Sequence, residues 1–507
     1  MKIKDFFKGK TKRIVIATII GVVVLASIIT PLIILSAGNI LARAAANCDT
    51  IIIDAEYSTA AKTLTVSQTI RYTNRSEAML DQIKFHIYAN AYRDGAKFGP
   101  VTTTDVPKAY PNGKNFGGIE IKSVAANGLD TEILIGGEDE NVLPVPLSSP
   151  IYPSETVLIE IIYEVALANI RHRLGYTEQS VNLGNFYPVP CVYENGEWQT
   201  YPYSTNGDPF YNDLHNFEVS IKCDKDLAVA SSGTMISEKN DDKKKVVLFQ
   251  SKAIRDFAMV LSKQFKTLTK LCDKIAVNYF YLDDTDPHAS MATAVAALQT
   301  FSRVFAKYPY KQLSVVQTEF LQGGMEYGEL VYISTDVTER NELDRVIVHE
   351  IAHQWWYGLV GNNQTCTAWI DEGLAEYSTL VFYDENPSYK IDRMSLIGNA
   401  RSNYAAYVKI VNSINGEVDP EMNRDLNSFQ SGYEYVFMTY VRGMLLFADL
   451  EMVVGKTNVK RALKSFATDR MFSFGGYESL VGHFEKNTKA NLGLFFKSYL
   501  GGVPEKQ

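Results

Sequence analysis

Cysteine is scarce in this chain of 507 residues, which has five cysteines and no CxxC pair. An odd number at irregular spacing excludes a disulfide framework, and a buried free thiol is the expected state of each. Compositional bias is also lacking, because 46% hydrophobic and 21% charged residues are close to the averages of globular proteins. The length therefore predicts two or three folded domains with sizeable cores.

A net positive charge is lacking outside the N-terminus. Residues 1–47 carry a net charge of +6, so the remainder carries −14 out of the total of −8. An acidic body of this size repels phosphate backbones, and this argues against a nucleic-acid-binding protein.

Long apolar runs are lacking after residue 40, but one precedes it. Residues 14–37 contain no charge and are long enough to cross a bilayer as a helix. The basic residues in 1–13 predict a cytoplasmic tail, so the sequence predicts a single-pass cell-membrane protein whose remaining residues are extracellular. A cleaved signal peptide is the alternative, since Ala42-Arg43-Ala44 has small residues at cleavage spacing, and the protein would then be secreted.

Two domains are predicted after a linker at 38–47. Apolar and polar residues alternate in short segments between 48 and 266, as at Leu64 and Val66, which predicts an antiparallel β-sandwich. Between 267 and 507 the strand-like segments LSVVQT and LVYIS are followed by mainly helical patterns. This change predicts an α+β domain and a multidomain fold that combines β and α+β parts.

The segment ELDRVIVHEIAHQWWYG contains the spacing of a metal site. His349 and His353 are four residues apart in a helical pattern, so both imidazoles project from one face. Two neutral imidazoles suit zinc, and a catalytic zinc site needs one more protein ligand and an open position for water. Glu350 lies beside the first histidine, where it can accept a proton from that water.

The third ligand distinguishes the classes of zinc peptidase. Trp356 and Leu359 stand where a metzincin requires glycine and histidine, so that class is excluded. Glu372 lies nineteen residues after the second histidine in WIDEGLAEYSTLVFY, itself a helical pattern. It completes a set of two histidines and one glutamate for one Zn²⁺ per chain. Glu376 follows one turn later and is predicted to accept the second N–H of a zinc-bound histidine, with a solvated helix carboxylate as the alternative.

The motif HEIAHQWWYG followed by WIDEGLAEY closely resembles the M1 family of zinc aminopeptidases, which are gluzincins. Gly323-Gly324-Met325-Glu326-Tyr327 is similar to the family's GxMEN motif, and Tyr440-Val441-Arg442-Gly443 is similar to its Y-x-K-G segment. The resemblance covers about residues 50–505 and implies a thermolysin-like catalytic domain. Because the chain ends at Gln507, it also implies a short form without the C-terminal helical domain and with a more open cleft.

The resemblance implies a role for each motif residue. Glu326 would bind the free α-amino group of a peptide substrate, and Tyr440 would donate to the oxyanion that develops in the transition state. Gly323 and Gly324, with Met325, would let the substrate backbone lie alongside as an added strand.

Three departures from the family pattern are visible. Tyr327 replaces the asparagine of GxMEN, and Arg442 replaces a lysine, which keeps the charge but not the geometry. A second amine-binding residue from the β-rich domain has no matching motif, although Glu178 and Gln179 are nearby in sequence.

The sequence therefore predicts a membrane-anchored zinc metallopeptidase that releases N-terminal residues from peptides. An endopeptidase with the same zinc chemistry is one alternative, because Tyr327 departs from the exopeptidase motif. A catalytically silent peptide-binding protein is another, although such a protein usually loses a metal ligand or the base. The preferred N-terminal residue and the oligomeric state are left open.

Overall fold

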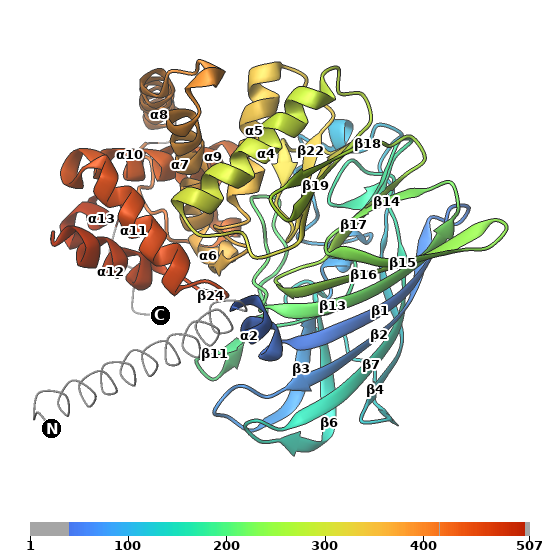
Figure 1. Cartoon of the computed structure of the whole chain (residues 1–507). Coiled ribbons are helices and arrows are strands. Elements are labelled where there is room, and N and C mark those ends of the chain that lie inside the picture. Colours follow the sequence, from blue (N-terminus) through green and yellow to red (C-terminus); the bar gives the residue numbers. More distant parts are fainter. Residues whose placement is uncertain (1–39, 415, 502–507) are drawn as a thin grey trace, which may run out of the picture. The chain divides into compact units, whose positions relative to one another are not determined.

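The computed structural model describes residues 40–414 and 416–501 (Figure 1). The predicted tail 1–13 and the predicted membrane segment 14–37 lie outside these residues. Helix α2 (Ile40–Ala46) occupies most of the predicted linker. Within the described ranges, no helix is both long and apolar enough to cross a membrane. The chain from Cys48 onward forms one compact unit.

The largest sheet has eight strands in the order β15-β16-β13-β1-β2-β7-β4-β5. Leu64, Val66 and Ile70 of its strand β2 are buried while their neighbours are exposed or half-buried, so the predicted period-two alternation is confirmed. The strands are β1 (Asp49–Ser58), β2 (Thr63–Thr73), β4 (Gly118–Ala126), β5 (Leu129–Asp130), β7 (Thr156–Ala166), β13 (His215–Asp224), β15 (Thr234–Asn240) and β16 (Lys244–Ile254).

One pair of strands in this sheet corrects the prediction of a wholly antiparallel sandwich. Strand β1 runs parallel to β13, with Ile51 opposite Phe217 and Ile53 opposite Val219, whereas the other pairs of the sheet are antiparallel. Side-chain alternation is the same for either direction, so periodicity could not reveal this. A parallel pair needs a long connection, and most of the β-rich region lies between these two strands.

Three smaller sheets complete the β-rich region. They have the orders β10-β3-β6, β11-β12 and β14-β17-β9-β8. Strands β9 and β17 are buried along their whole length, which suits sheets covered on both faces. The bounds are β3 (Leu80–His86), β6 (Val142–Ile151), β8 (Leu174–Tyr176), β9 (Val181–Gly184), β10 (Val189–Pro190), β11 (Tyr193–Glu194), β12 (Glu197–Trp198), β14 (Ala228–Ser231) and β17 (Ala258–Ser262), with the short helices η1 (Tyr88–Tyr92) and α3 (Val106–Ala109) between them.

A mixed five-stranded sheet, in the order β18-β19-β20-β22-β21, begins the second half of the chain. Strands β20 and β22 contain the predicted LSVVQT and LVYIS segments and are buried throughout, as expected for parallel neighbours. The short strand β21 is at the edge of the sheet. The bounds are β18 (Lys266–Cys272), β19 (Ile275–Tyr281), β20 (Gln312–Thr318), β21 (Gly324–Met325) and β22 (Leu330–Ser334), with helix α4 (Pro287–Val304) connecting β19 to β20.

Helices form most of the chain after β22, as predicted, and they occupy the orange and red part of Figure 1. They are α5 (Arg340–Ala352), α6 (Gln364–Thr367), α7 (Trp369–Glu385), η2 (Pro387–Tyr389), α8 (Arg393–Ile414), η3 (Leu426–Ser428), α9 (Gly432–Val436), the π-helical η4 (Phe437–Val441), α10 (Arg442–Val454), α11 (Lys456–Asp469), α12 (Tyr477–Thr488) and α13 (Gly493–Leu500). The pair β23 (Val360–Gly361) and β24 (Ser473–Phe474) joins two loops.

A buried arginine joins the β-rich half to the helical half. Arg255 donates to the backbone oxygens of Asn212 at 3.0 Å, Tyr357 at 2.7 Å and Ser473 at 2.9 Å. A Cβ on Gly361 would lie 2.2 Å from its guanidinium carbon, so glycine is needed there. The two halves are therefore fixed to each other close to the helix that carries the metal motif.

Candidate active site

Helix α5 presents the two histidines of the metal motif from one side. His349 is in its last turn, and His353 follows directly as the C-cap residue with helical dihedral angles. Both side chains are buried, and their Nε2 atoms are 3.1 Å apart. The four-residue spacing therefore brings the imidazoles together, as the sequence predicts.

Helix α7 supplies the third donor. The Oε2 atom of Glu372 lies 3.3 Å from Nε2 of His349 and 3.3 Å from Nε2 of His353. Zinc bonds of about 2.0–2.2 Å in tetrahedral geometry require donors about 3.3–3.6 Å apart, which is close to this spacing. That oxygen is also buried and has no hydrogen-bond partner among the described residues. The three donors fit one zinc ion.

Both imidazoles are oriented by a second polar contact. Nδ1 of His353 is 3.0 Å from the backbone oxygen of Trp356. Nδ1 of His349 is 3.2 Å from Oε1 of Glu376, and the same carboxylate oxygen accepts from Arg345 at 2.8 Å. These partners favour the tautomers that turn Nε2 toward the metal position. Glu376 therefore lies close to the second ring nitrogen of His349 and to Arg345.

Tyr440 lies in the π-helical segment η4, between α9 and α10. Its hydroxyl donates to Oε1 of Glu372 at 2.5 Å, and its ring stacks on His349 with centroids 5.7 Å apart. Single π-helical turns within α-helices are frequent at functional sites, because the extra residue changes the direction in which a side chain projects. The sequence predicts this tyrosine but gives no signal for the π-helix.

The edge strand β21 lies beside the predicted base. A Cβ on Gly324 would stand 2.3 Å from Oε1 of Glu350, so the carboxylate occupies the space that this glycine leaves open. A Cβ on Gly323 would meet only Val346 at 3.7 Å, an ordinary contact. From the sequence, both glycines are predicted to lie against the substrate backbone. Packing within the protein requires a glycine only at position 324, because a side chain there would collide with Glu350. The free edge of β21 still offers a position for an added strand.

Glu326 follows β21 and is buried within an acidic cluster. Its Oε1 accepts from Nε2 of Gln364 at 2.9 Å. Burial, reinforced by the charge of Asp208, raises the pKa of Glu326 well above its usual range. Met325 contacts Arg173, whose Nε is 3.1 Å from the sulfur. The GxMEN-like segment is therefore anchored on both the β-rich and the helical sides.

Asp208 was not identified from the sequence. It is buried and forms an ion pair with Arg173, and Glu372 and Glu326 both feel its charge. Glu178 is exposed. Gln179 interacts through its main chain, whose N–H donates to Glu319 and whose oxygen accepts from Ser262. Asp208 therefore belongs to the acidic cluster, whereas the exposed Glu178 does not share its burial. Its only signal in the sequence is an acidic residue in the loop segment STNGDPFYND.

Tyr327 points away from the cluster into the β-rich half. It is fully buried, and a Cβ on Gly184 of β9 would collide with its hydroxyl. Its backbone oxygen accepts from Gln354 at 3.0 Å. Tyr327, which stands where the family motif has asparagine, therefore serves in packing. Its main chain is still held in place beside Glu326.

The titration of the buried groups is strongly perturbed. Burial raises the pKa of Glu350 to about 7. Burial opposes ionisation of Glu372, but His353 and His349 outweigh it and lower the pKa to about 2. Burial likewise opposes protonation of His349, yet the carboxylates of Glu372 and Glu376 raise its pKa to about 9. An enclosed site with this many carboxylates favours cations, whether a metal ion or an ammonium group.

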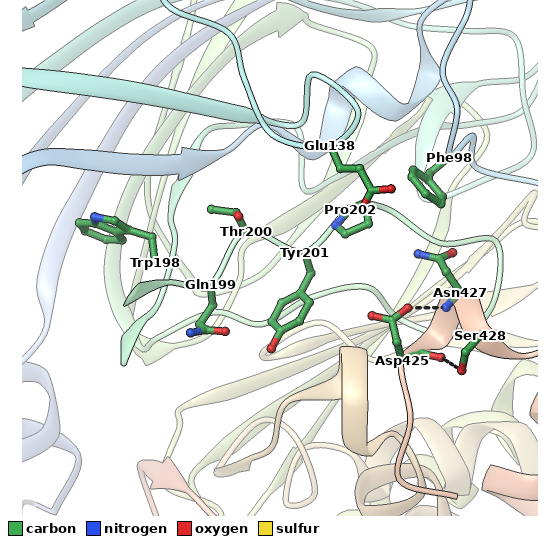
Figure 2. Close-up of a pocket in the computed structure, with 10 residues that line it drawn as sticks. All are labelled: Phe98, Glu138, Trp198, Gln199, Thr200, Tyr201, Pro202, Asp425, Asn427 and Ser428. Atoms are coloured by element: carbon green, nitrogen blue, oxygen red, sulfur yellow. Dashed lines mark hydrogen bonds between the residues drawn. The ribbon is translucent and has the colours of Figure 1, made fainter. Parts of the chain in front are cut away.

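A cavity of about 630 Å³ lies along two loops that lead to the site (Figure 2). The first loop follows Trp198, the last residue of β12, contains Tyr201 and continues to Asp208. The second contains Asp425 and continues to α9 and Tyr440. The two loops are in contact, since Asn206 donates to the backbone oxygen of Leu426 at 3.1 Å. Trp198 and Tyr201 make one wall partly aromatic, whereas Asp425, Asn427 and Ser428 make the other wall polar.

Two histidines and a glutamate in this geometry, with a glutamate base beside them, define a zinc site of the metallopeptidase class. Residues 289–499 match the model of the Peptidase family M1 domain. The chain is 26% identical to the mitochondrial aminopeptidase 2 of Saccharomyces cerevisiae over 193 residues, which are 35% of this chain and 20% of that protein. It is 23% identical to the puromycin-sensitive aminopeptidase of Caenorhabditis elegans over 286 residues, 52% of this chain and 30% of that protein.

Solved structures show the same fold over more of the chain. An M1 zinc metallopeptidase of Deinococcus radiodurans superposes with a TM-score of 0.62 at 15% identity, covering 90% of this chain and 94% of that one. A variant of that enzyme bound to the substrate Tyr-Ser-Ala gives a TM-score of 0.61 at 14% identity, with the same coverage. The β-rich half and the helical half together therefore have the M1 peptidase fold, whereas the chain matches less than a third of the length of these two aminopeptidases.

Proposed function

We propose that this chain is a zinc aminopeptidase that releases N-terminal residues from peptides. One observation carries the proposal: the three zinc donors, Glu350 and the buried pair Glu326 and Asp208 all belong to one acidic cluster. A base beside the metal position can accept the proton of the attacking water, which peptide hydrolysis requires. A carboxylate buried beside the metal site can pair with an ammonium group, so it favours a substrate with a free amino terminus.

Each side chain has a distinct part in the proposed reaction. Bound zinc supplies Lewis acidity, which makes water nucleophilic near neutral pH and polarises a peptide carbonyl. Glu350 takes the proton that water loses and delivers it to the departing amine. The hydroxyl of Tyr440, which contacts the ligand Glu372, would donate to the carbonyl oxygen as that oxygen becomes negative, and would so stabilise the transition state more than the bound substrate. Glu326 holds the α-ammonium and fixes which bond is cut.

The experiment compares one peptide with a free amino terminus and the same peptide N-acetylated, using the zinc-loaded protein. We expect release of the first residue from the free peptide and at least a hundredfold lower kcat/KM for the acetylated one, because a buried carboxylate loses its charged partner (~3 kcal/mol). Equal rates would favour an endopeptidase. Absence of chelator-sensitive hydrolysis would favour a silent binding protein.

We also propose that residues 14–37 anchor the protein in the cell membrane with the peptidase domain outside. The support is the sequence alone, namely an uncharged run of 24 residues preceded by basic residues. Separation of cells into membrane and soluble fractions, followed by protease treatment of intact cells, tests this. Recovery of a soluble protein that begins after Ala44 would instead indicate signal-peptide cleavage.

A further inference from the structure

A buried glutamine connects the helix α7, which carries the ligand Glu372, to the carboxyl group of Glu326. Gln364 is 1% exposed, and its Nε2 donates both to Oε1 of Glu326 at 2.9 Å and to Oδ2 of Asp371 at 2.7 Å. Asp371 precedes the ligand Glu372 on α7 and also accepts from Asn362 at 2.8 Å. The amide of Gln364 therefore holds the carboxyl groups of Glu326 and Asp371 at a fixed separation.

The orientation of this amide follows from its neighbours. Carboxylate oxygens accept hydrogen bonds, so the end of the amide that lies between two of them is the nitrogen. Its oxygen Oε1 is bonded to the same carbon and lies about 2.3 Å from that nitrogen. This oxygen is buried and has no hydrogen-bond partner in the part of the chain that the structure describes. A buried amide oxygen without a donor is costly, and a donor from a ligand would satisfy it.

We propose that Gln364 is a substrate-binding residue: its amide nitrogen positions Glu326, and its amide oxygen accepts a hydrogen bond from the α-ammonium group of the peptide. The inference rests on the proposed aminopeptidase function. An ammonium has three N–H donors, and one carboxylate uses only part of them. A neutral oxygen beside that carboxylate adds a second acceptor and gives the ammonium a direction without adding a further charge.

The segment that carries Gln364 is held rigidly. Asn363 caps the short helix α6 by accepting from the backbone N–H of Thr365 at 3.1 Å, and its Nδ2 donates to the hydroxyl of Tyr201 at 3.2 Å. Tyr201 is a wall residue of the cavity in Figure 2. The amide is therefore fixed before a substrate arrives, which reduces the entropy that binding must overcome.

The test measures binding instead of turnover. In a zinc-loaded Glu350→Gln background, which slows hydrolysis, titration calorimetry compares trialanine with N-acetyl-trialanine. We expect the free peptide to bind more tightly, and we expect Gln364→Met to reduce that preference by about tenfold or more, since a hydrogen bond to a charged group is lost. The affinity for N-acetyl-trialanine should change by less than about twofold, because its amide makes no use of the site.

A matched control is Gln317→Met in the same background. Gln317 is a buried glutamine whose Oε1 accepts from the backbone N–H groups of Leu282 and Asp283, on a different part of the fold. Its replacement should lower the melting temperature and leave the preference for the free amine intact.

Three results would overturn the inference. Gln364→Met could keep the full preference for the free peptide. It could also lower the affinity for both peptides equally, and that second result would indicate a purely structural role. A crystal structure of the Glu350→Gln protein with trialanine could show the ammonium more than about 4 Å from Oε1 of Gln364, beyond hydrogen-bonding distance, and this test holds even where Gln364→Met does not fold. Absence of any preference while Gln364 is intact would instead refute the proposed function itself.

Discussion

Gly373 of α7 and Gly443 of α10 are in backbone contact: a Cβ added to Gly373 would lie 2.9 Å from the Cα atom of Gly443. Gly373 follows the zinc ligand Glu372, and Gly443 lies one turn after Tyr440. The close approach of the two helices therefore brings the Tyr440 hydroxyl to the carboxylate of Glu372. Both glycines are needed because any side chain would separate the helices.

We expect Gly443→Ala to destabilise the protein by about 1–3 kcal/mol, as overpacking of a tight contact does, and to lower kcat more than zinc affinity. Denaturant unfolding and zinc titration measure the two effects. Gly482→Ala in α12 is the control, because no described atom lies within 4 Å of its added Cβ. That change should leave activity intact and stabilise the helix slightly. Unchanged stability in Gly443→Ala would contradict the packing assigned to this pair.

Glu350→Gln should retain one zinc per chain and lose about 10²–10⁴-fold in kcat, because the proton acceptor is removed while the metal donors stay. Metal analysis and steady-state kinetics check this. A variant with near-normal turnover would show that another group accepts the proton.

Glu326→Ala and Asp208→Asn test the acidic cluster. We expect Glu326→Ala to reduce kcat/KM for free peptides by about tenfold or more, because it removes an acceptor for a charged donor. Asp208→Asn should also weaken the binding of those peptides. It leaves the buried Arg173 without its charged partner, so a loss of stability should accompany it. Unchanged kinetics of Glu326→Ala on free peptides would remove its assigned role.

The buried carboxyl group of Glu329 should make the stability of the protein vary with pH, with or without bound metal. Burial raises its pKa from 4.5 to about 8, and Ser251 donates to it. A carboxyl whose pKa is raised in the fold contributes stability below about pH 4.5, and this contribution is lost as the pH rises through about 8. Glu329→Gln stays neutral, so it should match the wild type at pH 5 and be more stable by on the order of 3 kcal/mol at pH 8.5.

Thermal unfolding of both proteins between pH 5 and 8.5 provides the measurement for Glu329. Glu197→Gln, at an exposed residue of the β12 strand, serves as the control and should follow the wild type throughout. Parallel curves for Glu329→Gln and wild type would show that this carboxyl is ionised in the fold.

Local patterns in the sequence predict the metal centre well. The spacing of His349 and His353 acts within one helical segment, so helix geometry alone brings their imidazoles together. The alternation in β2 and the apolar segments of β20 and β22 likewise depend only on which residues are buried.

Features that depend on distant contacts could not be predicted in this way. The parallel pairing of β1 with β13 depends on the path of the chain between them, not on side-chain alternation. Asp208 and Gln364 are single polar residues in irregular or short segments, and only the folded chain brings them to Glu326. The role of Gly324 also emerges only when Glu350 is seen in the space beside it.

The most direct test of the zinc site is the metal content and ligation of the purified protein. We predict one zinc per chain, with X-ray absorption showing two nitrogen ligands and one oxygen ligand from the protein, and loss of the metal in His349→Ala and in Glu372→Ala. Hydrolysis should disappear with a chelator and return with added zinc. Zinc retained in full by both variants, or a protein that binds none, would contradict the account.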